Sequence, residues 1–264
     1  MDLLLKSIDQ FLALYLTVFF RILAMFSQMP GLSSKSITTK VKVLLGLSIT
    51  LVMAPMLPKV IVKELMSIDF FIIILQQIVI GVGMGFVLKI FVDMFSFCGF
   101  MLSMQAGLSF AATVDPSNGQ QVPIMSQFYT MITTLLFFLF DYHLVCFEIL
   151  FHSFETLPPH IKTFSDINYT SLWKWSASIF EAGFIMATTA IFSLFLINLS
   201  FGVMTKAAPQ LNIFSLGFPV TMLCGLFIMY LVFDYTNEHV IYFWKSTKLA
   251  LCNYANINCV QRGI

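Results

Sequence analysis

Three titratable side chains recur at helical spacing inside one long apolar stretch. Asp141, Glu148 and His152 follow one another so that a continuous helix would carry them on one face. Carboxylates and an imidazole in such a row could relay protons across a membrane. The row lies near the end of its stretch, where acidic side chains reach water. We therefore interpret it as an interfacial helix end rather than a proton path.

The remaining chemistry-bearing residues form no metal or nucleotide motif. The four histidines and five cysteines make neither C-x-x-C nor H-x-x-x-H spacing, so we expect no zinc site and no cofactor. Gly81, Gly83 and Gly85 follow no strand and precede more apolar sequence, which argues against a nucleotide-binding turn and favours close helix packing. We expect the cysteines to be buried free thiols: Cys98, Cys146, Cys224, Cys252 and Cys259.

Arg21 lies in the middle of the first apolar stretch. A guanidinium at membrane depth is costly unless it pairs or faces a polar interior. Because Arg21 is far from both ends of the stretch, snorkelling explains it poorly. We expect this side chain to face protein.

These residues belong to a chain that is too apolar for a soluble domain. It has 264 residues, of which 59% are hydrophobic and only 10% charged, and its mean hydropathy is +0.91. Soluble domains carry about 25% charged residues. This composition excludes an ordinary cytosolic enzyme and a disordered chain, and it predicts an all-α polytopic membrane protein. The net charge of +1 gives no indication of nucleic-acid binding.

About six apolar helices, paired as long hairpins, are predicted. The third stretch would form a helix about 50 Å long, whereas the hydrocarbon core of a bilayer is only ~30 Å thick. It therefore either projects from the membrane or bends into two pieces. The loop lysines give no clean inside–outside bias in either orientation. The predicted spans are 11–29, 43–57, 72–104, 124–151, 180–203 and 214–233.

A polar segment with turn chemistry separates the third and fourth spans. Residues 115–119 read Asp-Pro-Ser-Asn-Gly, which is typical of a tight turn. Taken alone, residues 105–122 would be a solvent-exposed loop packed on the outside of the helices.

Two long strings in this sequence resemble one known family. Residues 99–121 read GFMLSMQAGLSFAATVDPSNGQQ, and residues 206–219 read KAAPQLNIFSLGFP. Shorter matches are KVK at 40–42, the glycine-rich stretch 81–86 and SFETLP at 153–158. In these strings the chain resembles the FliR family, the R subunit of the bacterial flagellar export gate. Lys206 stands where that family usually has Arg, which keeps the charge but loses bidentate pairing.

The resemblance implies a non-enzymatic membrane subunit without cofactors. The chain would form one integral-membrane domain over residues 1–264, with N-terminal helices over 1–151, a C-terminal hairpin over 180–233 and a tail over 234–264. It would assemble with the P and Q subunits, and with further export-apparatus proteins, in the lipid of the inner membrane within the flagellar basal body. Unfolded flagellar proteins would pass through the resulting pore, and no nucleic acid is expected.

The resemblance also implies two groups of functional residues. Residues 105–122 would be a loop that plugs the closed pore, since its glycines allow sharp bends and its apolar side chains can block a narrow lumen. Its expected plug residues are Gln105, Gly107, Phe110, Asp115, Pro116, Asn118, Gly119 and Gln120. Contacts with neighbouring subunits are expected at Arg21, Lys206, Pro209, Gln210, Asn212, Phe214, Gly217 and Pro219.

Three alternatives remain open. The same gate role in a virulence type III secretion system would use the same fold, and genome neighbourhood would distinguish it. An independent small-solute transporter would need paired charges and broken helices at the membrane midplane, for which Asp141, Glu148 and His152 are the candidates. An intramembrane enzyme would need a catalytic cluster, and no such cluster is visible.

Overall fold

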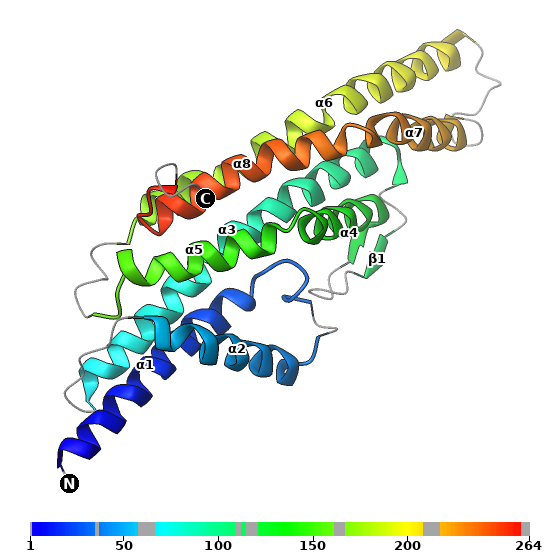
Figure 1. Ribbon diagram of the computed structural model, residues 1–264. Coiled ribbons are helices and arrows are strands. Elements are labelled where there is room, and N and C mark those ends of the chain that lie inside the picture. Colours follow the sequence, from blue (N-terminus) through cyan, green and yellow to red (C-terminus); the bar gives the residue numbers. More distant parts are fainter. Residues whose placement is uncertain are drawn as a thin grey trace. The chain divides into compact units, whose positions relative to one another are not determined.

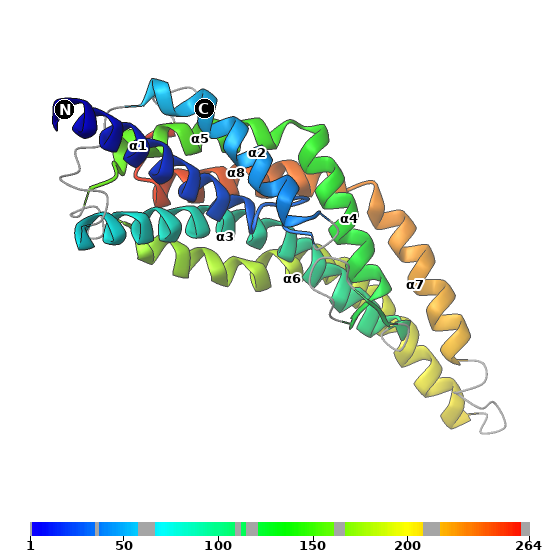
Figure 2. The same ribbon diagram turned by 90° about the horizontal axis from the view of Figure 1, so that it is seen from below.

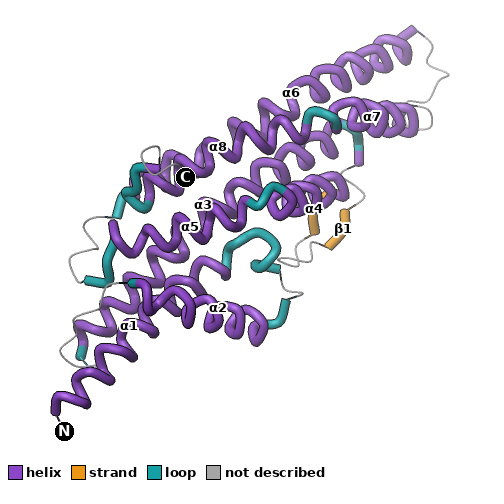
Figure 3. The backbone as a smooth tube through the Cα atoms, in the orientation of Figure 1, coloured by secondary structure: helices purple, strands orange, loops and turns teal. Residues whose placement is uncertain are grey.

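A computed structural model describes residues 2–34, 37–57, 67–108, 112–114, 121–160, 167–207 and 217–259. Over these residues the chain is almost entirely helical, as predicted, with one short antiparallel strand pair that the sequence did not lead us to expect (Figure 3). Figure 1 shows the helices in chain order. Their bounds are α1 Asp2–Phe26, α2 Thr39–Met53, α3 Ile68–Gln105, α4 Ile124–Leu139, α5 Tyr142–Thr156, α6 Tyr169–Ala207, α7 Phe218–Phe233 and α8 Thr236–Tyr254.

The third apolar stretch is one uninterrupted helix. Helix α3 has 38 residues, and α6 has 39. At 1.5 Å per residue each is over 50 Å long, well beyond the thickness of a bilayer core. Of the two possibilities left open by the sequence, the break of α3 into two pieces is therefore excluded.

The predicted fourth span is wrong as a single helix. It divides into α4 and α5 at Phe140 and Asp141, and Asp141 has a left-handed backbone with φ of 56°. Aspartate tolerates this conformation better than most residues. Asp141 and Glu148 are exposed, and His152 lies 3.4 Å from the Glu155 carboxylate. Asp141 therefore stands at the break before α5 and not inside one continuous span, and Glu148 and His152 follow within α5.

Four helical stretches are individually long and apolar enough to cross a membrane: residues 9–26, 39–56 (α2 with the 3₁₀ turn η1, Ala54–Met56), 68–105 and 169–204. Two further pairs, α4 with α5 and α7 with α8, meet the same requirement only if each bent pair counts as one span. The described part of the chain thus has four to six candidate spans, which agrees with the predicted membrane fold. The predicted sixth span contains α7, with its first residues 214–216 outside the described part of the chain, and the tail continues as helix α8.

The chain divides into two compact units. One contains Met1–Ile90, Phe137–Ser176 and Ser246–Ile264, and the other contains Phe91–Leu136 and Ala177–Lys245. Each unit has its own core, and we describe each by itself. In the first unit, α1 and α2 pack against each other (Figure 2).

Candidate subunit interface and pore loop

In the first unit, the Arg21 side chain of α1 is completely buried and joins α1 to α3 and to the end of α5. Its Nε donates to Gln77 Oε1 at 2.8 Å, its Nη1 to Ser153 Oγ at 3.0 Å and its Nη2 to the Leu157 carbonyl at 2.6 Å. The guanidinium also lies 3.9 Å from the centre of the Phe154 ring. None of these partners is a carboxylate. Arg21 therefore faces protein, as expected, through neutral hydrogen bonds and a cation–π contact.

These contacts give Arg21 an internal role. All three types of guanidinium nitrogen have partners within the same unit, and no surface of the side chain remains exposed. Contact between Arg21 and a neighbouring subunit stays a prediction. The partners Ser153 and Leu157 belong to the SFETLP string, so their spacing of four residues is the sequence signal for this site.

The alternating glycines of α3 allow other helices to approach it closely. A Cβ atom at Gly81 would meet the backbone oxygen of Arg21, and one at Gly85 would lie 2.7 Å from the backbone oxygen of Met25. A Cβ at Gly83 would instead collide with the Tyr254 ring of α8. The prediction that these glycines serve helix packing is confirmed, because two of them face α1 and one faces α8.

In the second unit, the first residues of the expected plug pack where the chain leaves α3. Helix α3 ends at Gln105, and Gly107 then turns the backbone with φ of 72°. Ala106 and Leu108 are buried against Leu194 of α6. A Cβ at Gly225 of α7 would lie 2.5 Å from the Ala106 side chain. The chain thus leaves α3 from a packed apolar anchor formed with α6 and α7.

A two-stranded ribbon frames the segment that follows. Strand β1, Ala112–Val114, pairs antiparallel with β2, Gln121–Pro123, and Val114 lies opposite Gln121. Of the expected plug residues, Gln105 and Gly107 belong to the anchor. The others lie outside the described residues: Phe110, Asp115, Pro116, Asn118, Gly119 and Gln120. The ribbon therefore places Val114 next to Gln121.

The described ends of the second hairpin carry the remaining contact candidates. Lys206 is exposed in the last turn of α6, where its charge also suits the helix dipole. At the start of α7, Gly217 is buried and Pro219 is exposed. The other four candidates lie outside the described residues: Pro209, Gln210, Asn212 and Phe214.

Helices α6 and α7 expose far more apolar surface than water would tolerate. Large side chains with more than half of their surface exposed recur along both helices. Lipid or another apolar protein surface must cover these faces. The exposed side chains are Trp173, Phe180, Phe184, Ile185, Phe192, Phe195, Leu199 and Val203 on α6, and Leu223, Phe227, Tyr230 and Leu231 on α7.

Comparison with known proteins assigns the chain to a family. Residues 12–247 match the family described as bacterial export proteins, family 1. The chain is 34% identical to the flagellar biosynthetic protein FliR of Escherichia coli over 220 residues, which cover 83% of each chain. This chain belongs to the FliR family of bacterial export proteins. It is also 35% identical to FliR of Pectobacterium carotovorum over 79% of each chain, and 26% identical to FliR of Bacillus subtilis over 86% of this chain and 88% of that protein.

Membership of the FliR family, together with apolar helices long enough to cross a bilayer, makes this chain a membrane-embedded component of flagellar protein export. The matched region includes Arg21, the glycine face of α3, the β1–β2 hairpin and both ends of the α6–α7 connection. Within the described residues, no group of three or more His, Cys, Asp or Glu side chains is arranged to hold a metal ion.

Two features of the structure were not predicted from the sequence. Cys252 and Cys259 form a disulfide, so the expectation of five free thiols is wrong for this pair. Cys98, Cys146 and Cys224 are free. The β1–β2 ribbon was also missed, because two strands of three residues are too short to show a periodic pattern.

Proposed function

We propose that this chain is the R subunit of a flagellar export gate in the inner membrane, within the basal body. It would assemble with the P and Q subunits around a pore through which unfolded flagellar proteins pass. Its own part in this would be structural, without a catalytic step. The observation that carries this proposal is the family match over residues 12–247.

The exposed apolar faces of α6 and α7 support assembly. Both helices end at the connection 208–216, which reads APQLNIFSL and carries the polar Gln210, Asn212 and Ser215. Helices of P and Q subunits would supply apolar cover for the faces. Exposed Lys206 and Pro219, one on each side of this connection, are the described residues best placed to contact them.

We further propose that residues 105–122 close the pore. A plug needs a rigid attachment and a compact shape, so that forces in the lumen do not displace the plug. The buried anchor at Ala106 and Leu108 supplies the attachment, and the β1–β2 pairing supplies a compact neck. Irregular backbone of this kind is tolerated at membrane depth where protein encloses it.

Affinity purification in mild detergent tests the assembly. The tagged chain, expressed with its partners, should bring down the P and Q subunits in one stable particle that mass spectrometry identifies. A monomer or homodimer recovered while P and Q are present but unbound would contradict the proposal. An independent transporter would then become the leading hypothesis, and Asp141 and Glu148 would be its first mutants.

The relatives named above are flagellar proteins, which favours the flagellar system over a virulence secretion system. Restoration of swimming in a flagellar strain that lacks its own R subunit would support this choice. Assembly with P and Q without restored swimming would favour the virulence role.

A further inference from the structure

The cysteines of this chain are paired selectively. The disulfide between Cys252 and Cys259 closes a seven-residue separation at the end of α8, with 6.1 Å between the two Cα atoms. The other three cysteines are free, and Cys98 and Cys146 among them are buried. The pairing joins the last turn of α8 to the segment that follows it.

The segment between the two cysteines docks onto other parts of the first unit. Thr156 Oγ1 at the end of α5 donates to the Ala255 carbonyl at 2.6 Å, and Tyr254 Oη donates to the Val79 carbonyl of α3 at 3.3 Å. The Ile257 amide donates to the Cys252 carbonyl at 2.8 Å, and Ala255 is completely buried. The disulfide therefore closes a turn that holds the end of α8 against α3 and α5.

We propose that this disulfide forms in the oxidising compartment outside the cytoplasmic membrane, and that the end of α8 lies on that side. Stable disulfides are rare in the reducing cytoplasm and common outside it. This inference depends on the cysteine pair and not on the proposed gate function. It supplies the orientation that the loop lysines do not give.

The reaction is a thiol–disulfide exchange with a disulfide-carrying oxidoreductase of that compartment. The thiolate of one cysteine attacks the donor's disulfide and forms a mixed disulfide, which releases one donor thiolate. The second cysteine then attacks the mixed bond. The chain loses two electrons and two protons, and the donor leaves as a dithiol.

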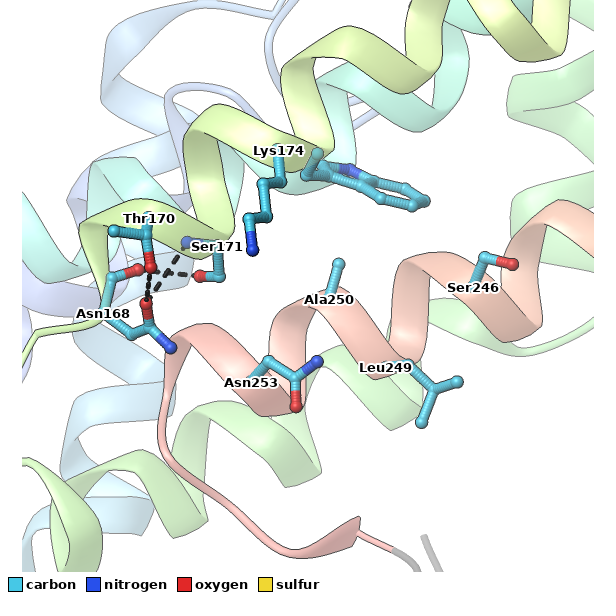
Figure 4. A pocket seen from close by; sticks show the side chains of 9 residues that line it. Asn168, Thr170, Ser171, Lys174, Ser246, Leu249, Ala250 and Asn253 are labelled. Atoms are coloured by element: carbon cyan, nitrogen blue, oxygen red, sulfur yellow. Dashed lines mark hydrogen bonds between the residues drawn. The ribbon is translucent and has the colours of Figure 1, made fainter.

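The start of α6 lies on the same side as the disulfide. A pocket of about 420 Å³ separates the first turns of α6 from the last turns of α8, and residues from both helices line it. In Figure 4, Lys174 of α6 extends toward α8, and Ala250 and Asn253 of α8 lie across from it. Trp173, in the same part of α6, is 81% exposed, as is common for tryptophan at a membrane–water boundary.

The opposite end of α6 must then face the cytoplasm if this helix crosses the membrane. Residues 169–204 of α6 form one candidate span, which is longer than the bilayer core requires. Thr170 and Lys206 are both exposed and lie near its two ends. These two positions therefore report on the two sides of the membrane.

Thiol trapping in intact cells tests the disulfide. Cells are quenched with acid and N-ethylmaleimide, and the full chain is digested with trypsin. Cleavage after Lys248 and Arg262 places both cysteines in one peptide, residues 249–262. We expect this peptide to carry no maleimide and to be two hydrogens lighter than the dithiol form. A host that lacks the disulfide donor should yield mainly the doubly alkylated peptide.

Two results would overturn the proposal. One is a doubly alkylated peptide from wild-type cells. The other is a closed peptide that appears only when the maleimide quench is omitted, because the bond would then form after lysis. Cys224 serves as the internal control, since its peptide should be alkylated in every sample.

Site-directed labelling tests the orientation. In a Cys224→Ser background, Thr170→Cys should react with a membrane-impermeant maleimide in right-side-out vesicles. Lys206→Cys should react only in inside-out vesicles. The reverse pattern, or labelling of both positions from one face, would contradict the proposed orientation even if the disulfide is present.

Thermal unfolding of the detergent-solubilised chain tests whether the bond is structural. A reductant should lower the Tm of the wild type by about 5 °C and leave the Tm of the Cys252→Ser/Cys259→Ser double variant unchanged. Cys224→Ser should respond to reductant as the wild type does. An unchanged wild-type Tm after verified reduction of the 249–262 peptide would show that the bond does not hold this turn.

Discussion

At the scale of single residues, the chain satisfies a buried cation with neutral groups. Arg21 is bound by an amide oxygen from α3 and by a hydroxyl and a carbonyl from the end of α5, and it stacks on Phe154. A planar guanidinium can hold three such acceptors at once, whereas the lysine ammonium is a compact point charge. The geometry thus explains why arginine, rather than lysine, occupies the middle of α1.

Arg21→Met should destabilise the first unit by about 3 kcal/mol, because it leaves the Gln77 amide oxygen and the Leu157 carbonyl buried without a donor. Ser153→Ala removes only one partner and should cost about 1 kcal/mol. Thermal unfolding of the detergent-solubilised protein measures both. Equal effects of the two substitutions would contradict the central role of Arg21.

A second residue-scale prediction concerns the glycine face of α3. Gly81→Ala places a methyl group against the backbone of α1, which cannot move as a flexible side chain can, and it should cost roughly 2 kcal/mol. Gly202→Ala is the matched control, since no atom lies within 4 Å of its added Cβ, and it should be neutral or slightly stabilising. Comparable loss of Tm in both variants would argue against close α1–α3 packing as the cause.

At the scale of elements, the connection between α3 and α4 is a hairpin with a buried attachment. Ala106 and Leu108 pack with α6, and β1 pairs with β2, so Val114 and Gln121 lie together within the second unit. A loop held in this way can block the lumen of a closed pore and can move out of the lumen as one piece when the pore opens. These contacts support the proposed plug over a solvent-exposed loop.

Deletion of residues 107–120 should make membranes that contain the assembled gate leaky to small solutes. Conductance of reconstituted vesicles measures the leak, and co-purification of P and Q shows that the particle still assembles. A Gly/Ser replacement of residues 109–120 keeps the length of the segment but removes Phe110, so it should leak as well. Unchanged conductance in an assembled particle would exclude the plug.

At the scale of the whole molecule, exposed apolar helices require a partner or lipid. The α6–α7 hairpin presents its apolar side chains along both helices, and the exposed Lys206 lies where α6 ends. A charge at the rim of an apolar contact directs pairing more than it adds affinity. Assembly should therefore depend on the sign of this charge.

Lys206→Glu should lower recovery of P and Q about tenfold, because a favourable charge contact becomes repulsive and the helix end also loses a suitable charge. Lys174→Glu reverses an exposed charge near the opposite end of the same helix and should leave recovery unchanged. Quantitative pull-down compares the two. Equal recovery from both variants would remove Lys206 from the interface.

The sequence by itself determined the class of the protein and much of its site. Composition predicts a helical membrane fold because a bilayer allows few other structures, and the strings at 99–121 and 206–219 indicate the family because they extend over many residues. The alternating glycines predict close packing, and the mid-helix position of Arg21 predicts a protein environment. These features depend on local pattern or on the cost of burying a charge, and both are visible in the chain alone.

Only the tertiary structure decided which residues meet. Gln77, Ser153 and Leu157 lie 56, 132 and 136 residues from Arg21, and no periodicity predicts that they share one guanidinium. The break at Asp141 depends on a left-handed backbone within an apolar run that reads as helix throughout. The Cys252–Cys259 pair depends on a turn after α8 that brings the two Cα atoms within bonding range. Contacts at such separations arise from the packing of whole helices, which local sequence does not specify.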